Sequence, residues 1–419
     1  MEYKNLLQLA KDEKLDKTGE TKKLSIRGKV NDIYSVYAIP LEYLYYNNQN
    51  GRINTAYKKY SSTNGLLCTE PGDSEYNMIF EKFIYESNVQ AMKETKQSIL
   101  DKLQQEPGVV LPDGRVIDGN RRLTALRMIA RENNEDRCFN AIILPLYVKS
   151  KYDEKIIKEL ELDLQLGREE RVNYDPIDRI FDVYNTIEVE KLMTIDEYKK
   201  ASGVKSAKGI NRDIRLAELI IKFIEIVSPG GNPIDKFYLA RDLKLDGPIE
   251  EIENTITKLK SKDKEAIKEA VLVYMISTKA IDIDSDTTRV MRDLKNNILK
   301  DTERLQYFLD AADEKVDVIM DIFDENPLKT SNELKTLFNE NSEAQRSMCS
   351  LTTSTNSIIV KGKIINERTK ALIELENVRD SLSEIDAEDF AELTADEHIQ
   401  ARDVIKDIND ILYRLNKDI

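Results

Sequence analysis

The stretch VLPDGRVIDGNRRLTALR, residues 110–127, carries the strongest local structural signals of the chain. Residues 112–114 (Pro-Asp-Gly) predict a turn, and residues 115–117 predict a short strand. Asp118 and Gly119 predict a second tight turn, after which apolar residues recur at helical spacing. We therefore expect a strand, a glycine turn and a helix in immediate succession.

The expected helix begins with two arginines, directly after the glycine turn. A helix N-terminus presents unpaired backbone N–H groups and the positive end of the helix dipole, which together attract anions. Arg121 and Arg122 add forked donors that match phosphate geometry. This pattern predicts a phosphate-bearing ligand at Gly119, although solvated arginines at an ordinary helix start would give the same sequence.

Composition indicates a globular protein of 419 residues, long enough for two to four domains. No run of eighteen apolar residues predicts a membrane span, and the first residues are polar, so we expect no membrane association. Three widely spaced cysteines favour neither zinc nor disulfides, which fits a reducing cytoplasm. The single histidine, His398, excludes a Ser-His-Asp triad in the first half and a His-dependent HNH nuclease centre, and we expect it at the surface.

Charge is unevenly distributed along the chain. Residues 1–245 carry 39 Lys and Arg against 39 Asp and Glu, whereas residues 246–419 carry 24 against 38 and hold the whole net charge of −14. The acidic part should repel nucleic acid. We therefore expect any DNA contact in the first half of the chain.

A helix-turn-helix pattern lies within residues 171–227. Thr194 and Glu197 have the spacing of a capping box, Gly203 ends the first helix, and Ser206 caps a second helix to about Ile226. In a helix-turn-helix the second helix enters the major groove of DNA. The predicted DNA contacts are Lys205, Lys208, Asn211, Arg212 and Arg215. A plain helical hairpin with a solvated basic face is the alternative.

The remaining chain divides at a turn-rich stretch. Residues 228–233 (SPGGNP) predict a linker, which we extend to residues 228–245. Residues 246–419 predict an acidic helical domain, with a Ser/Thr-rich interruption at residues 351–357. The last helix has apolar residues at three-four spacing, which suits either a dimerisation module or a monomeric bundle.

Several segments, in order, resemble the ParB/sulfiredoxin-like superfamily. The sequence DGNRRLTA at residues 118–125 is similar to the Gly-Glu-Arg-Arg box of that family. The companion segments are IPLEYL (39–44), NNQNGR (47–52), QSIL (97–100), the strand 141–148, QLGREE (165–170) and YDPID (174–178). The resemblance covers roughly residues 39–226, and the box also resembles that of nucleotide-binding domains in phage-restriction proteins.

This resemblance implies an α+β fold: an N-terminal ParB/sulfiredoxin-like domain followed by a helix-turn-helix and a mostly α-helical C-terminal half. We expect an N-terminal extension at residues 1–35, the nucleotide-binding domain at 36–170, and the DNA-binding region at 171–227. A ParB-like protein of this kind would bind DNA as a homodimer. A nucleoside triphosphate would act as its conformational switch, and CTP is the first candidate.

The family assigns a nucleotide-binding role to several positions. The resemblance implies that Gly119, Asn120, Arg121 and Arg122 cradle phosphates, with Arg52, Gln165 and Arg168 from the companion segments. Mg²⁺ normally accompanies such a ligand. Leu164 stands where the family has an acidic residue, and Asn120 where it has glutamate. The resemblance therefore implies nucleotide binding more strongly than hydrolysis, and no protein metal site is predicted.

Two alternatives remain open at the level of sequence. One is a nuclease or NTPase of a phage-defence or mobile-element system on the same fold, for which Asp113 and Asp118 are the only carboxylates near the box. The other is an adaptor whose acidic half, residues 246–419, binds a protein partner such as an ATPase. Partition and defence roles are not distinguished by these residues.

Overall fold

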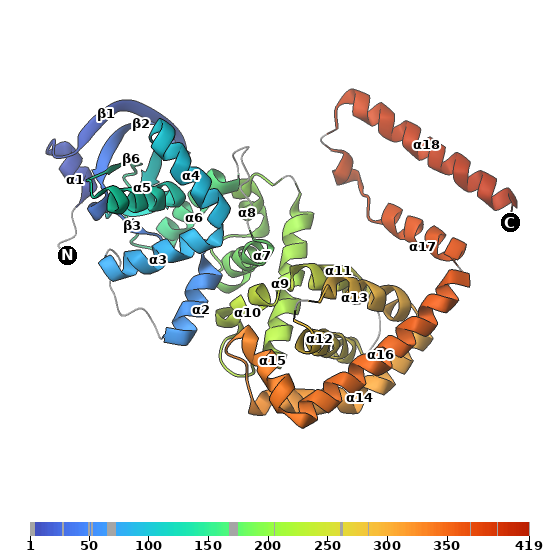
Figure 1. The fold of residues 1–419 in the computed structure, drawn as a ribbon. Helices are drawn as coiled ribbons and strands as arrows, with labels where there is room; N and C mark the ends of the chain where they lie inside the picture. Colours follow the sequence, from blue (N-terminus) through green and yellow to red (C-terminus); the bar gives the residue numbers. More distant parts are fainter. Residues whose placement is uncertain are drawn as a thin grey trace. The chain divides into compact units, whose positions relative to one another are not determined.

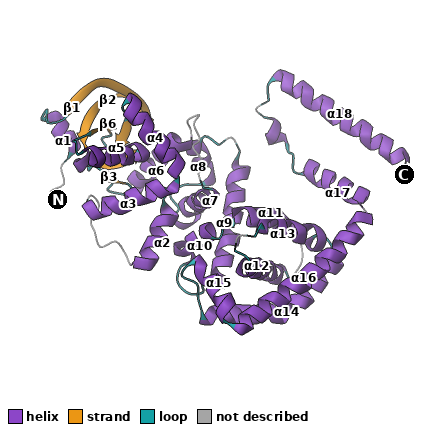
Figure 2. Ribbon diagram, viewed as in Figure 1, coloured by secondary structure: helices purple, strands orange, loops and turns teal. Residues whose placement is uncertain are grey.

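The computed structural model describes residues 5–26, 29–48, 51, 53–64, 73–166, 175–204, 206–259, 263–283, 285–368, 370–391 and 393–418. The chain divides into two compact units, Met1–Ile359 and Val360–Ile419. All described strands lie in the N-terminal part of the first unit, and the rest is helical (Figure 2). The predicted α+β class is confirmed at this level, whereas the ParB-like relationship stays a prediction.

A mixed six-stranded sheet forms the N-terminal layer, in the order β1-β2-β6-β4-β5-β3. The strands are β1 (Asp16–Ile26), β2 (Lys29–Pro40), β3 (Tyr45–Tyr46), β4 (Gly108–Val110), β5 (Arg115–Asp118) and β6 (Cys138–Ile143). The β1–β2, β2–β6 and β4–β5 pairs are antiparallel, and the β3–β5 and β4–β6 pairs are parallel. The predicted strand at residues 115–117 is confirmed as β5.

Helices cover both faces of this sheet (Figure 1). The helices of this part are α1 (Leu6–Lys11), η1 (Leu41–Tyr43), α2 (Asn54–Asn64), α3 (Ser74–Ser87), α4 (Val89–Lys102), α5 (Asn120–Asn133) and α6 (Lys151–Leu166). Successive strand residues point to opposite faces. Val116 therefore packs with α3, α4 and α5, whereas its neighbour Ile117 packs with α6 on the other face.

The rest of the first unit is a helical bundle around a second core. Its elements begin with α7 (Pro176–Tyr184), the π-helical turn η2 (Asn185–Val189), α8 (Ile195–Ser202), α9 (Ala207–Val227), η3 (Pro233–Lys236), α10 (Tyr238–Asp242) and α11 (Asp246–Lys258). They continue with α12 (Lys264–Ile281), α13 (Thr287–Leu294), η4 (Lys295–Leu299), α14 (Thr302–Glu325), α15 (Ser331–Glu340) and α16 (Ser342–Arg368). Helix α12 is the centre, because every residue from Ala270 to Ala280 is buried. Such an all-round burial explains its near-continuous apolar run.

Two predicted boundaries differ from the structure. The predicted extension at residues 1–35 contains β1 and most of β2, the longest strands of the sheet. The predicted linker at residues 228–245 contains η3 and α10 instead, with Phe237 and Leu239 fully buried in the helical core. The turn itself is present at Gly230 and Gly231, both at positive φ, but the apolar residues after it anchor the chain.

The predicted Ser/Thr-rich interruption at residues 351–357 is wrong, because α16 runs through it without a break. The hydroxyl groups donate to carbonyls one turn back, as in the 2.8 Å bonds from Thr352 to Met348 and from Thr355 to Leu351. This back-bonding satisfies the hydroxyls inside a helix. The segment therefore keeps its backbone hydrogen bonds and stays helical.

The second unit consists of the end of α16, α17 (Lys370–Ser383), the short η5 (Ala387–Phe390) and α18 (Ala395–Asp418). His398 is exposed on α18, as predicted. Many large apolar side chains of α18 are exposed, among them Ile399, Val404 and Ile411. Among the residues that the structure describes, no helix is both long enough and apolar enough to cross a membrane.

Candidate functional site

The ends of β3 and β5 form the edge of the sheet at which the candidate site lies. The two strands are parallel, with Tyr46 opposite Val116. The C-terminal ends of both strands therefore lie at the same edge of the sheet. By this register Asn47, the residue after β3, lies beside the last residues of β5, and Gly119 follows β5 directly. The Tyr46 hydroxyl and Thr124 Oγ1, which are 2.8 Å apart, join this edge to α5.

Helix α6 completes the edge from the other face of the sheet. Its Leu160 and Leu164 pack with Ile117 of β5 in one buried cluster. The Gly51 backbone N–H donates to Glu161 Oε1 across 3.4 Å, which ties the segment after β3 to α6. Gly51, the Gly119 turn and α6 thus lie near one another, whereas Arg52 and Arg168 lie outside the described residues. Gln165 is in the last turn of α6, and its side chain also lies outside them.

Gly119 is the residue that turns the chain from β5 into α5. Its backbone is left-handed, with φ of 97°, a conformation that glycine adopts without strain. A Cβ atom there would lie 2.8 Å from Phe139 Cζ and 3.1 Å from an Arg122 guanidinium nitrogen. Glycine is thus required by both the backbone angle and the close packing, as the predicted turn implied.

The α5 N-terminus combines ion pairs with unsatisfied polar atoms. Arg122 donates to Asp118 Oδ2 across 3.1 Å, and the nearly buried Lys22 lies 3.9 Å from the same oxygen and 2.5 Å from the Pro107 carbonyl. Arg122 is therefore held by a carboxylate rather than open to solvent. Arg122 Nε and Asn120 Oδ1 are buried and have no hydrogen-bond partner among the described residues.

The two carboxylates near the box have structural partners. Asp113 accepts a 2.7 Å hydrogen bond from the Tyr45 hydroxyl and lies 3.6 Å from the Arg115 guanidinium. Asp118 is held by Arg122 and Lys22 as described. Within the described part of the chain, no group of three or more His, Cys, Asp or Glu side chains is arranged to hold a metal ion.

A cavity of about 210 Å³ lies next to this edge, between α2, α6, α7 and η2. Its lining residues are Asn48, Asn54, Tyr57, Lys58, Glu154, Ile157, Lys158, Glu161, Phe181, Asn185, Thr186, Glu190 and Leu192. The cavity thus adjoins the segment after β3 and the face of α6 one turn before Gln165. None of its lining residues belongs to α5.

A buried ion pair supports the cavity wall and was not foreseen from the sequence. Lys158 of α6 donates to Asp182 of α7 across 2.5 Å, and Asp182 also accepts from the Tyr198 hydroxyl across 3.3 Å. Burial alone would lower the pKa of Lys158, but the Asp182 and Glu161 carboxylates raise it above its usual value. The lysine therefore stays charged. Its neighbours one turn away on α6 include Glu154, Lys155 and Glu161, so the local sequence resembles a solvated helix face and does not mark the lysine as buried.

The helix caps predicted for α8 and α9 are confirmed, whereas the helix-turn-helix role of these helices stays a prediction. Thr194 and Glu197 form the capping box of α8, Gly203 ends α8 in the left-handed region, and Ser206 Oγ accepts from the Lys208 backbone N–H. These contacts were predicted because each joins residues within four positions of one another. Lys208 is exposed in the first turn of α9, and Lys205 lies outside the described residues.

Arg212, Arg215 and Asn211, which are also predicted DNA contacts on α9, form the following contacts within the protein. Arg212 lies 2.6 Å from Glu250 and Arg215 lies 2.5 Å from Glu253, both on α11. The Glu253 side chain is only 3% exposed, so this pair is an internal contact between α9 and α11. Asn211 donates to the Ala207 carbonyl of its own helix across 3.1 Å. Local sequence could not reveal these partners, which lie 38 residues away in each case.

Comparison of the chain with protein-family models, with curated proteins and with solved structures finds no match in any of the three.

Proposed function

We propose that the protein binds a nucleoside triphosphate, CTP before others, at the sheet edge where β3 and β5 end, and that the ligand controls DNA binding by α8 and α9. The observation that carries the proposal is the parallel register of β3 and β5. This register brings Asn47, which follows β3, and the Gly119 turn, which follows β5, to one edge, and the Gly51–Glu161 hydrogen bond adds α6.

The chemistry of the edge favours a polyanion. The first N–H groups of α5 point out of the helix beside Gly119, which has no side chain to cap them. Arg121 and Arg122 supply the guanidinium groups, and the unsatisfied Asn120 Oδ1 and Arg122 Nε add one acceptor and one donor. A Mg²⁺ ion on the phosphate oxygens would reduce the charge that these groups neutralise.

Binding is proposed without hydrolysis. Leu164, at the position where the related family has an acidic residue, is buried against the sheet with Ile117. Asp113 and Asp118 are held by Tyr45, Arg115, Arg122 and Lys22. The role of the ligand would then be to shift the population of conformations.

Calorimetric titration of the full chain with the four Mg²⁺-bound ribonucleoside triphosphates tests the nucleotide proposal. We expect CTP to bind, and Arg121→Ala to weaken binding by about tenfold or more, since one charge-assisted contact contributes about 1.5 kcal/mol or more. Arg137→Ala is the control, because Arg137 pairs with Glu135 across 2.6 Å in the turn beyond α5. Equal affinities for all three proteins, or no binding at millimolar nucleotide, would contradict the proposal.

DNA binding is the second part of the proposal, and the exposed first turn of α9 favours it. Lys208 lies there, after the Gly203 turn. In fluorescence-anisotropy titrations with duplex DNA, Lys208→Ala should reduce the slope of log K against log salt by about 1. Lys222→Ala, which removes a lysine paired with Glu269 on the same helix, should leave the slope unchanged. If CTP alters neither protein's DNA affinity, nucleotide control fails even where binding stands.

The predicted homodimer and the predicted ATPase partner of residues 246–419 remain predictions. Sedimentation of the full chain against a chain ending at Ile359 would measure the contribution of the second unit to self-association.

A further inference from the structure

Helix α2 has two faces of different chemistry. Ala56, Tyr57 and Tyr60 pack against the apolar core of the sheet layer. Thr55, Lys58, Lys59 and Ser62 recur at the i, i+3, i+4 and i+7 positions and therefore share one polar face. We call this polar face the α2 clamp, because its four residues all bond to the helical bundle.

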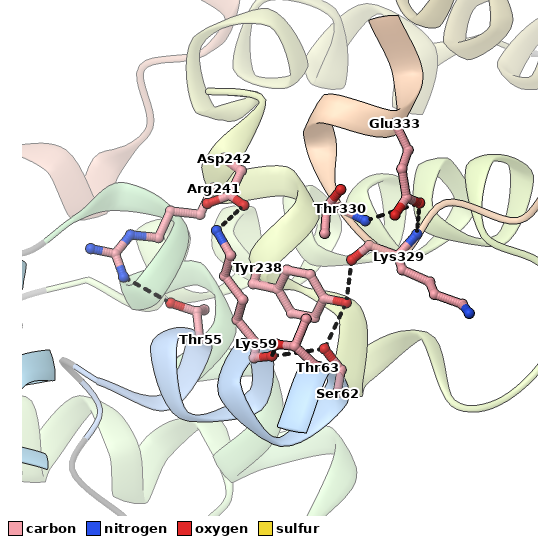
Figure 3. A network of polar contacts seen from close by, with 10 residues as sticks. All are labelled: Thr55, Lys59, Ser62, Thr63, Tyr238, Arg241, Asp242, Lys329, Thr330 and Glu333. Atoms are coloured by element: carbon pink, nitrogen blue, oxygen red, sulfur yellow. Dashed lines mark hydrogen bonds and ion pairs between the residues drawn. The ribbon is translucent and has the colours of Figure 1, made fainter. Parts of the chain in front are cut away.

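Each clamp residue has a hydrogen-bond partner in the helical bundle, and we call this contact between the sheet layer and the bundle the seam. Lys58 donates to Asp235 of η3 across 2.6 Å, and Lys59 donates to Asp242 of α10 across 2.5 Å. Figure 3 shows the Lys59 contact, together with the 3.0 Å bond from Ser62 to the Tyr238 hydroxyl and the 2.9 Å bond from that hydroxyl to the Lys329 carbonyl. The clamp thus reaches η3, α10 and the chain before α15.

The seam differs from the two cores that it joins. The sheet core and the helical core are separate apolar clusters, and a smaller apolar cluster joins Leu162 of α6 to the bundle. The contacts of the α2 clamp, in contrast, are ion pairs and hydroxyl hydrogen bonds. Ionic strength screens exposed charge pairs and leaves apolar burial largely unaffected or strengthened. Added salt should therefore weaken the α2 contacts selectively, while the apolar clusters stay packed.

A buried carboxylate lies at one end of the clamp. Asp178 of α7 accepts a short hydrogen bond from the Thr55 hydroxyl and lies 3.4 Å from Arg241 of α10, which also donates to Thr55 across 3.1 Å. The other charged groups that face it are Asp175 and Asp182. Burial raises the pKa of Asp178 to about 7, against the lowering effect of Arg241.

We propose that the α2 clamp is a reversible, charge-controlled contact between the sheet layer and the helical bundle, which opens without unfolding either. The proposal needs no bound nucleotide and stands apart from the proposed function. The position of the clamp matters for the cavity, because Asn54, Tyr57 and Lys58 of α2 line it. Opening of the clamp would change the cavity wall on that side.

The sign of the pH effect follows from the Asp178 pKa. A carboxyl whose pKa is raised on docking favours the docked state when it is protonated, and this contribution is lost as pH rises towards 7. The clamp should therefore be tighter at pH 5.5 than at pH 8. Above pH 7 the effect should level off, because the group is then ionised in both states.

Hydrogen–deuterium exchange of the full chain tests the proposal, with protection factors corrected for intrinsic exchange. We expect the protection of α2 and α10 to fall at least tenfold from pH 5.5 to pH 8, and several-fold from 0.05 to 0.5 M NaCl at pH 6. Protection of α12, at the centre of the helical core, should stay constant. Equal changes in α2 and α12 would mean global destabilisation and would overturn the proposal, as would constant protection of α2.

Two variants and one control separate the clamp from general stability. Lys59→Ala should lower α2 protection and reduce its salt dependence, and Asp178→Asn should remove the dependence on pH. Lys96→Ala is the matched control, because Lys96 forms an ion pair of 2.5 Å with Glu132 elsewhere in the sheet layer. If Lys96→Ala changes α2 protection as much as Lys59→Ala does, the clamp has no specific role and the proposal fails.

Discussion

Helices α5 and α9 both follow a turn and both carry arginines in their first half, yet the two sets of guanidinium groups have different partners. Arg122 of α5 pairs within its own turn, with Asp118 four residues earlier. Arg212 and Arg215 of α9 pair with Glu250 and Glu253 of another helix. The same sequence pattern thus gives a local ion pair in one place and a tertiary contact in the other.

The difference lies in what each arginine leaves available. At α5 the pairing leaves Arg122 Nε and Asn120 Oδ1 unsatisfied, beside helix N–H groups that have no cap. At α9 the Arg215 guanidinium pairs with the Glu253 carboxylate, whose side chain is 3% exposed. The main effect of Arg215 is therefore on the packing of α9 against α11. The proposed ligand site uses the start of α5, whereas Arg215 supports the packing of α9 on α11.

Replacement of Arg215 by alanine should give the larger stability effect. It leaves Glu253 buried with only Thr257 as a remaining partner in the described structure, and loss of one partner of a buried pair is strongly destabilising. We expect a loss of about 2 kcal/mol, less than for a fully buried pair because the Arg215 side chain is 38% exposed. Urea denaturation followed by circular dichroism measures it.

Arg212→Ala is the control on the same helix. Arg212 and Glu250 are both close to half exposed, and exposed pairs contribute about 0–1 kcal/mol. If the two variants lose equal stability, the distinction between a structural Arg215 and an exposed Arg212 fails. Restored stability in Arg215→Ala with Glu253→Gln would sharpen it, since the second change removes the unpaired charge.

Local signals in the sequence predicted the features that depend on near neighbours. The start of α5 at Gly119, the capping box of Thr194 and Glu197, and the cap at Ser206 each depend on residues within one helical turn. The residues 115–117 gave β5 for the same reason. These parts of the candidate site could be predicted without knowledge of tertiary contacts.

The β1–β2 hairpin could not be predicted in this way, because a lysine occupies a buried position in it. Lys22 is 8% exposed and reaches the Pro107 carbonyl and Asp118 from β1. A charged residue at a buried position interrupts the alternation of apolar and polar residues by which a strand is predicted. The Lys158–Asp182 pair was missed for a different reason, because its two helices meet only in the folded chain.

Two glycines extend the comparison of α5 with α9 to smaller effects. In Gly119→Ala, the left-handed backbone and the approach of Phe139 to 2.8 Å should destabilise the fold by about 1 kcal/mol or more. In Gly209→Ala, no described atom lies within 4 Å of the added Cβ, and helix propensity should stabilise α9 by about 0.5 kcal/mol. Thermal unfolding should therefore shift in opposite directions.

The nucleotide affinity of these two variants sharpens the same comparison. Gly119→Ala moves the turn that presents the α5 N–H groups, so CTP affinity should fall by more than its stability loss explains at a temperature where the protein stays folded. Gly209→Ala should bind CTP as the unmodified chain does, because it lies in the first turn of α9, far along the chain from α5. Unchanged CTP affinity in Gly119→Ala would separate the glycine's conformational role from ligand binding, and Gly119 would then be a structural residue of the turn alone.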